Sequence, residues 1–137
     1  LRFNNLRFEA RTKAFSFFAL LLTFFFAAPY AHAQVSGTID SDTTWSSSTV
    51  TVSDTVIIAE GAVLTIDPSV TVRFQSNTGL VVKGGLVADG QRPSDRILFT
   101  SDASSPAPGD WNGITFVNKS DVGSYLDYTT IEYAGGG

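Results

Sequence analysis

The sequence has no cysteine and no methionine, and its one histidine, His32, lies near the N-terminus. Residues 34–137 can therefore form no disulfide, no thiolate or imidazole metal site, and no Ser-His or Cys-His nucleophile pair. Basic side chains are also scarce there, because five stand against twelve acidic ones, which gives a net charge of −7. An acidic segment without a basic stripe is a poor candidate for binding nucleic acid.

Residues 1–33 have a different composition and predict an export signal. They hold eight of the eleven Phe and four of the nine basic residues. A basic start is followed by an apolar run over 14–28, and then by Ala31-His32-Ala33. These are the three parts of a secretory signal peptide. The alternative, a membrane anchor, needs about 20 apolar residues, and Pro29 stops this run short. We therefore expect cleavage between Ala33 and Gln34, export by the general secretory route, and no membrane association afterwards.

The rest of the chain has the composition and patterning of an all-β domain. Val, Ile and Thr make up 32 of residues 34–137, and these β-branched residues favour strands. No apolar pattern with helical spacing occurs, whereas short alternating runs are frequent. We predict strands over 49–52, 56–58, 64–66, 70–74, 80–83, 86–88, 97–100, 114–116 and 126–133.

The connections between these runs favour a coil that winds around one core. Sharp turns rich in Gly, Pro and Asp, such as 59–61, 67–69 and 84–85, follow one another closely, and two longer polar loops come later. The turns are less evenly spaced than those of consecutive β-hairpins. This spacing suits a solenoid in which each turn adds a rung about 4.8 Å from the last.

The run Leu64-Thr-Ile-Asp-Pro-Ser-Val-Thr-Val-Arg-Phe74 resembles the opening coil of secreted right-handed parallel β-helix repeat proteins. Later sequence motifs of that family have similar counterparts here, in the same order, over residues 79–90, 97–101, 109–116 and 126–135. Ser69 departs from the pattern, because the family usually has Gly there. The resemblance implies a bacterial or archaeal surface or secreted protein, commonly large and multidomain. It says little about activity, because the same fold carries lyases, hydrolases, adhesins and inert stalks.

An antiparallel β-sandwich is the alternative fold, with Gly84-Gly85 as a hairpin turn. The expected domains are a signal peptide over 1–33, a lead-in segment over 34–48 and β-helix coils over 49–137. Because the chain opens with Leu1 and stops at Gly137, we expect a fragment of a longer protein. The alternation predicts these inward side chains: Val50, Val52, Leu64, Ile66, Val70, Val72, Phe74, Leu80, Val82, Leu86, Ile97, Phe99, Ile114 and Phe116.

Two patterns bear on enzymatic chemistry, and both are incomplete. Pectate lyases with this fold show an Arg-x-Pro-x-x-Arg motif, but Gln91 occupies its first position here, before Pro93 and Arg96. We interpret this stretch as a solvated corner. Hydrolases need neighbouring carboxylates, and no Asp-Asp pair occurs in the chain. We therefore predict no catalytic residue in this stretch, although a lyase or hydrolase with catalytic coils beyond residue 137 stays the alternative.

No cofactor is predicted, and Ca²⁺ is the alternative, because it prefers carboxylate oxygens. The acids that would bind it are scattered and lack an EF-hand or nonapeptide spacing, so we interpret them as surface residues. They are Asp40, Asp42, Asp95, Asp102, Asp110 and Asp121.

Exposed aromatic side chains are the predicted carbohydrate contacts, because their faces stack on sugar rings. Trp111 and Tyr125 are the best candidates, although Trp111 at a strand entry is more often a core residue. The sequence therefore predicts a non-catalytic extracellular or cell-surface β-helix segment of a larger secreted protein. Its expected partners are a polysaccharide or another cell-surface component, and the downstream domains of the same protein.

Overall fold

A computed structural model describes residues 32–117 and 123–135 of the chain. All but one of its elements are strands: β1 (His32–Ile39), β2 (Thr43–Trp45), β3 (Thr49–Ile58), β4 (Val63–Ile66), β5 (Thr71–Phe74), β6 (Leu80–Val82), β7 (Gly85–Asp89), the 3₁₀ turn η1 (Pro93–Asp95), β8 (Ile97–Ser101), β9 (Ile114–Phe116), β10 (Tyr125–Asp127) and β11 (Thr129–Ile131). No helix in these ranges is long and apolar enough to cross a bilayer. The apolar run over 14–28 of the predicted signal peptide lies outside the described residues.

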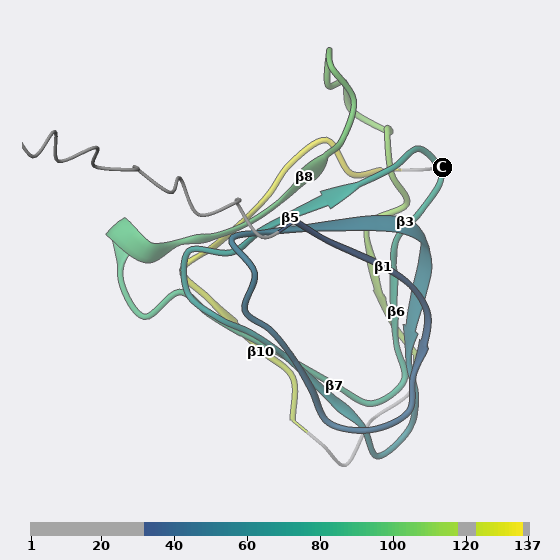
Figure 1. Cartoon of the computed structure of the whole chain (residues 1–137), viewed down its shortest axis with the longest axis vertical. Coiled ribbons are helices and arrows are strands. Elements are labelled where there is room, and N and C mark those ends of the chain that lie inside the picture. Colours follow the sequence, from purple (N-terminus) through teal and green to yellow (C-terminus); the bar gives the residue numbers. More distant parts are fainter. Residues whose placement is uncertain (1–31, 118–122, 136–137) are drawn as a thin grey trace, which may run out of the picture.

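The strands wind into a parallel β-helix with a roughly triangular cross-section (Figure 1). The strand β3 bends around one corner, because its first half pairs with β5 and its second half with β6. The first side of the triangle therefore holds the first halves of β1 and β3 together with β5, β8 and β11. The second side holds the rest of β1 and β3 with β6 and β9, and the third side holds β2, β4, β7 and β10.

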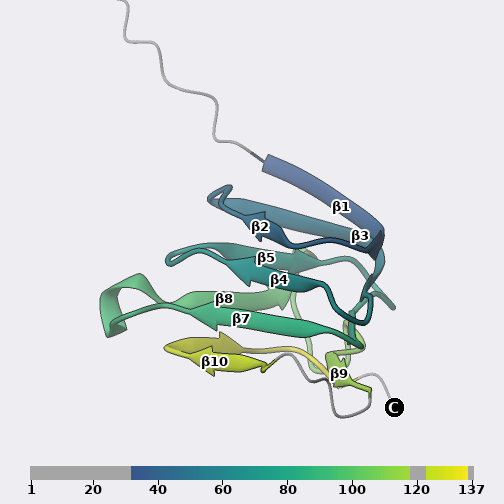
Figure 2. The ribbon, with the colours of Figure 1, turned by 90° about the horizontal axis from the view of Figure 1, so that it is seen from below.

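Every strand pair is parallel. The coils stack as layers from β1 to β10 (Figure 2), and the chain runs clockwise as it recedes from the viewer in Figure 1, which makes the coil right-handed. The parallel pairing excludes the antiparallel sandwich. It also excludes a hairpin at Gly84-Gly85, because β6 and β7 belong to different sheets. The predicted β-helix is therefore confirmed.

The residues predicted as a lead-in segment, 34–48, contain strands that pair with the next coil. The strand β1 pairs with β3 from His32↔Thr49 to Ile39↔Ile58, and β2 pairs with β4. Mostly exposed, polar positions hid β1 in the sequence. The predicted strand over 126–133 is in turn two strands, which are separated by a corner at Tyr128.

The core is a set of apolar columns in which residues from successive coils lie in register. Val50, Val72 and Phe99 form one column, and Leu64 and Leu86 belong to another. Twelve of the fourteen side chains predicted to point inward are buried. Six more are buried: Trp45, Val56, Ile58, Ala62 and Ala88, which were not predicted, and Trp111, for which the core was the alternative to a carbohydrate contact.

Ile114 and Phe116 are the two exceptions among the predicted core residues. Ile114 is half-buried and Phe116 is 50% exposed, although their partners Leu80 and Val82 are buried. Because β9 is the last strand on its side among the described residues, these side chains have an apolar neighbour on one side alone. Both residues are therefore in register with the core columns without being buried.

The corners of the coil need unusual backbone conformations. Ser69, which stands where the resembling family usually has Gly, adopts φ 66°. Non-glycine residues adopt this left-handed region infrequently. The Ser69 N–H donates a hydrogen bond to the Asp95 carbonyl of the next coil at 2.9 Å, which supports the corner.

Gly84 packs so tightly at a corner that alanine should not fit. A Cβ atom at this position would lie 2.1 Å from the Ala62 carbonyl oxygen and 2.3 Å from that of Ala59. Both are backbone atoms, so the coil has to shift. We expect Gly84→Ala to lower the free energy of unfolding by about 3 kcal/mol, measured by urea denaturation. The control is Gly123→Ala, which meets no atom within 4 Å, and equal losses in both variants would contradict the corner geometry.

Candidate functional site

The outer surface of the first side carries a row of polar side chains that runs along the coil axis, which we name the polar face. Thr51 lies opposite Gln34 on β1 and Arg73 on β5, and Arg73 lies opposite Thr100 on β8. Each step of this row crosses one coil, about 4.8 Å. Alternation along the strands creates the face, because the neighbours Val50, Val52 and Val72 point into the core.

Two shallow hollows of about 220 Å³ each lie beside this row. Gln75 lines both of them, so they adjoin each other, and we name them together the Gln75 groove. The groove is lined by His32, Ala33, Gln34, Thr51, Gln75, Ser76, Asp102 and Ala103. Its polar groups are mostly amides and hydroxyls, which donate and accept hydrogen bonds without carrying charge.

Charged side chains border the groove, and they are already paired. The Arg73 Nε–H donates to Asp102 Oδ1 at 2.8 Å, with the two side chains 41% and 32% exposed. On the next coil the Thr100 hydroxyl donates to Glu132 Oε1 at 2.7 Å. The guanidinium at the centre of the polar face therefore has a carboxylate of its own.

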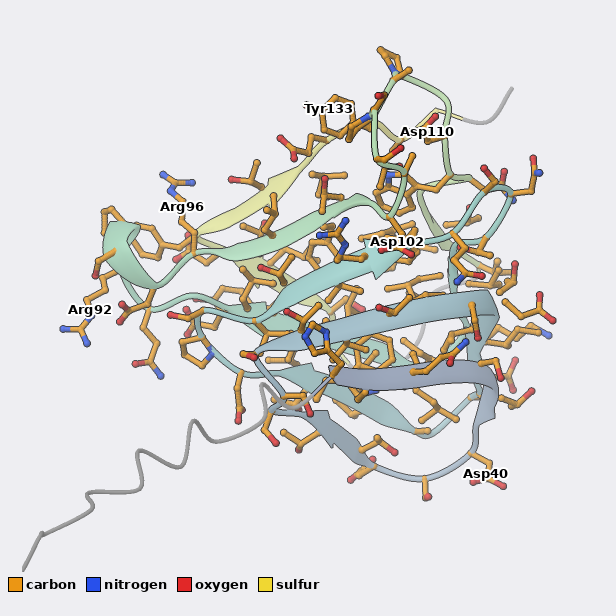
Figure 3. The ribbon with its side chains drawn as sticks, turned by 45° about the horizontal axis from the view of Figure 1, so that its top comes forward. Asp40, Arg92, Arg96, Asp102, Asp110 and Tyr133 are labelled. Atoms are coloured by element: carbon orange, nitrogen blue, oxygen red, sulfur yellow. The ribbon has the colours of Figure 1, made fainter. Side chains whose placement is uncertain are left out.

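Asp110 organises the polar loop between β8 and β9. Its Oδ2 accepts a hydrogen bond from the Ser101 hydroxyl at 2.6 Å and another from the Ala107 N–H at 3.0 Å. These two bonds, the hydroxyl first, lower the pKa of the Asp110 carboxyl. Figure 3 shows Asp110 beside Tyr133, whose carbonyl accepts the Asp110 N–H at 3.2 Å. Asp110 thus has a structural role in its loop.

Other acids predicted as alternative calcium ligands have separate local partners. Asp42 Oδ1 accepts the Val63 N–H at 2.9 Å, and Asp40 accepts the Ser41 hydroxyl at 3.4 Å. Asp95 is paired with Arg92 and Ser94, and these hydrogen bonds, that from Arg92 first, lower its pKa. Among the described residues no group of three or more His, Asp or Glu could hold a metal ion. Asp121 lies outside those residues.

The incomplete lyase motif lies on an exposed corner, as the sequence predicted. Gln91 and Arg96 flank the turn η1, which buries no residue. Figure 3 shows Arg92 and Arg96 together at this corner, away from Asp102 and Asp110. The two arginines therefore do not contribute to the Gln75 groove.

Trp111 is a core residue, which corrects its prediction as a possible carbohydrate contact. Its side chain is 0% exposed, its ring stacks on Phe74 with the centroids 3.9 Å apart, and its indole N–H donates to the Glu132 carbonyl at 2.9 Å. A buried ring has no face free for a sugar. Tyr125, the other predicted contact, is 48% exposed on the outer surface of the third side.

The carboxylates of Asp89 and Asp127 lie near Tyr125, and the sequence did not predict this proximity. Asp127 lies opposite Asp89 in the register of β10 and β7, and Asp67 continues this alignment on the preceding coil. Burial first, and then the charges of Asp89 and Asp127, raise the pKa of the Tyr125 phenol. The available signal was an Asp at the end of β7 and β10 and directly after β4, but unequal coil lengths concealed the alignment.

Local hydrogen bonds explain two of these aspartates. Asp89 Oδ1 accepts the Gln91 N–H at 2.7 Å, and Asp127 Oδ1 accepts the Tyr128 N–H at 2.8 Å. Each carboxylate thus satisfies a backbone N–H in the turn that follows its strand. Their recurrence is consistent with a structural role at the corners.

Comparison with known proteins agrees with this architecture. A segment of the chain is 36% identical over 66 residues to the Protein bark beetle of Drosophila melanogaster, and the match covers 48% of this chain but 2% of that protein. No solved structure matches the chain. A family model described as "Pectate-lyase like beta helix domain" matches residues 37–135, which is most of the chain. The chain therefore belongs to the family of pectate-lyase-like β-helix domains.

Proposed function

We propose that this β-helix is a non-catalytic extracellular or cell-surface module that binds polysaccharide in the Gln75 groove. The observation that carries the proposal is the groove itself, where amides and hydroxyls from successive coils line adjoining hollows. Such groups match the hydroxyls of sugars in hydrogen-bonding character. Because the row follows the coil axis, it places one polar residue on each coil at steps of about 4.8 Å, which suits an extended polymer.

Replacing Gln75 tests the groove directly. Gln75→Ala removes an amide that lines both hollows, and a neutral hydrogen bond contributes about 0.5–1.5 kcal/mol. We expect binding to weaken about 2- to 10-fold, measured by affinity electrophoresis through gels that contain polysaccharide. Gln91→Ala is the matched control, because Gln91 is exposed at the η1 corner. A panel in which neither variant differs from the wild type would contradict the proposed site.

Secretion is part of the same proposal and has its own test. Cleavage between Ala33 and Gln34 removes His32 and Ala33 from β1 and from the lining of the groove, but it leaves Gln34 to Ile39 and the pairing of Gln34 with Thr51. We expect mass spectrometry of exported protein to find an N-terminus at Gln34. Exported protein that retains residues 1–33 would contradict this cleavage site.

A polysaccharide lyase or glycoside hydrolase, with catalytic coils on a longer chain, is the second candidate. The alignment of Asp89 with Asp127 favours it, because glycoside hydrolases use two neighbouring carboxylates. Their hydrogen bonds to turn N–H groups favour the structural role. Reducing ends released from the same polysaccharides, and lost in Asp127→Asn, would support a hydrolase. Unsaturated products lost in Arg96→Ala would support a lyase.

A further inference from the structure

The pairing of Arg73 bears on the kind of polysaccharide that the Gln75 groove accepts, so this inference rests on the proposed function. A polyuronate carries a carboxylate on each sugar, and its binding requires cations that are free to meet those charges. Arg73 is the one Lys or Arg in the strands of the first side, β1, β3, β5, β8 and β11. Whether Arg73 is available therefore decides how the polar face responds to an anionic polymer.

Asp102 forms an ion pair with the Arg73 guanidinium. The Nε–H donates to Asp102 Oδ1 at 2.8 Å, and Asp102 itself lines one of the two hollows. A uronate that approached Arg73 would have to displace this carboxylate or lie beside it. At physiological ionic strength charges act over about 8 Å, so Asp102 opposes an anion at the place where Arg73 would attract it.

The surroundings add further negative charge. Glu132, which accepts the Thr100 hydroxyl, lies two coils from Arg73 along the polar face, one coil beyond Thr100. The other lining groups of the groove are amides, hydroxyls and His32, and His32 would leave with the predicted leader. Residues 34–137 carry a net charge of −7. An uncharged polymer can use the hydrogen-bonding groups of the groove without meeting this repulsion.

We propose that the Gln75 groove selects uncharged polysaccharides over polyuronates, and that the ion pair between Arg73 and Asp102 enforces this selection. The preferred ligand class is then uncharged, unlike the anionic pectate in the family's description. The selection depends on one carboxylate beside one guanidinium, so a single substitution should change it.

Asp102→Asn tests the proposal by removing the negative charge beside the guanidinium, although the Asn oxygen can still accept the Nε–H. The full chain and its variants are compared by affinity electrophoresis through galactomannan, β-glucan and polygalacturonate, with a chelator present to prevent bridging by divalent cations. We expect the wild type to bind a neutral polymer and to bind polygalacturonate at least 10-fold more weakly. We expect Asp102→Asn to bind polygalacturonate at least 5-fold more tightly than the wild type, with the gain lost in high salt.

Two controls separate the pairing from net charge and from damage to the fold. Asp54→Asn removes the same charge from an exposed position whose carboxylate accepts the neighbouring Thr55 N–H, and it should bring no such gain. Adding Arg73→Gln to Asp102→Asn should remove the gain. Circular dichroism and thermal unfolding of each variant show that the comparison is made between folded proteins.

The outcomes distinguish this inference from the proposed function. A wild type that binds polygalacturonate as tightly as the neutral polymers overturns the selection but leaves polysaccharide binding intact. An equal gain in Asp54→Asn, or no gain in folded Asp102→Asn, overturns the role of the ion pair. A wild type that binds none of the polymers overturns the proposed function, and the selection with it.

Discussion

Replacing Val72 with aspartate is expected to abolish folding of the β-helix. Val72 is 0% exposed and lies in register between Val50 and Phe99 on the coils before and after it. A carboxylate in this apolar column has no partner, and burying it costs several kcal/mol. Because small domains are stable by about 5–15 kcal/mol in total, the variant should lose the circular dichroism signal of native strands.

Thr71→Asp is the matched control for this substitution. Thr71 is the neighbouring residue on β5, is only half-buried and points to the outer surface. An aspartate there keeps its hydration, so we expect a loss of about 1 kcal/mol or less in urea denaturation. Similar losses at positions 71 and 72 would show that the assigned faces of β5 are wrong.

Trp111→Ala is expected to have the second-largest effect on stability. The indole is 0% exposed, its ring centroid lies 3.9 Å from that of Phe74, and its N–H donates to the Glu132 carbonyl. Truncation removes this packing, leaves a cavity and removes the donor to a backbone carbonyl. Large-to-small changes of this kind cost about 3–5 kcal/mol, which urea denaturation should measure.

Two further variants show which property of Trp111 is responsible. Trp111→Phe keeps an aromatic ring against Phe74 but loses the N–H donor, so its loss should be intermediate. Tyr125→Ala removes a ring that is 48% exposed, and we expect a change of about 1 kcal/mol or less. If Trp111→Ala were no more destabilising than Tyr125→Ala, the placement of Trp111 in the core would be wrong.

Alternation along single strands was enough to predict most of the fold. Val70, Val72 and Phe74 identify their own inner face without reference to any other strand, and all three are buried. The same logic failed at β9, because the burial of Phe116 depends on a neighbouring coil, and among the described residues β9 has one on one side alone. It also missed Ala62 and Ala88, whose small side chains give little hydrophobic signal although they are fully buried.

The candidate site was much less predictable than the core. Gln34, Thr51 and Arg73 are neighbours across coils, but unequal stretches of chain separate them, so no spacing in the sequence identifies the row. The corners determine the register, and they depend on backbone conformations such as φ 66° at Ser69. Trp111 shows the same limit, because its position at a strand entry favours the core but does not identify Phe74 of the preceding coil as its partner.

The core columns, the polar face and the Arg73–Asp102 pair all depend on the parallel register between coils. Since the chain has no cysteine, an engineered pair can report on it without interference. Thr49 and Thr71 are directly paired across β3 and β5, where neighbouring strands lie about 4.8 Å apart, within the range that a disulfide spans. Thr51 and Thr71 lie on the same strands but are offset by two residues.

We expect Thr49→Cys with Thr71→Cys to oxidise readily in the folded protein, and Thr51→Cys with Thr71→Cys to stay reduced. Efficient disulfide formation in the offset pair, with none in the aligned pair, would contradict the register and with it the proposed site.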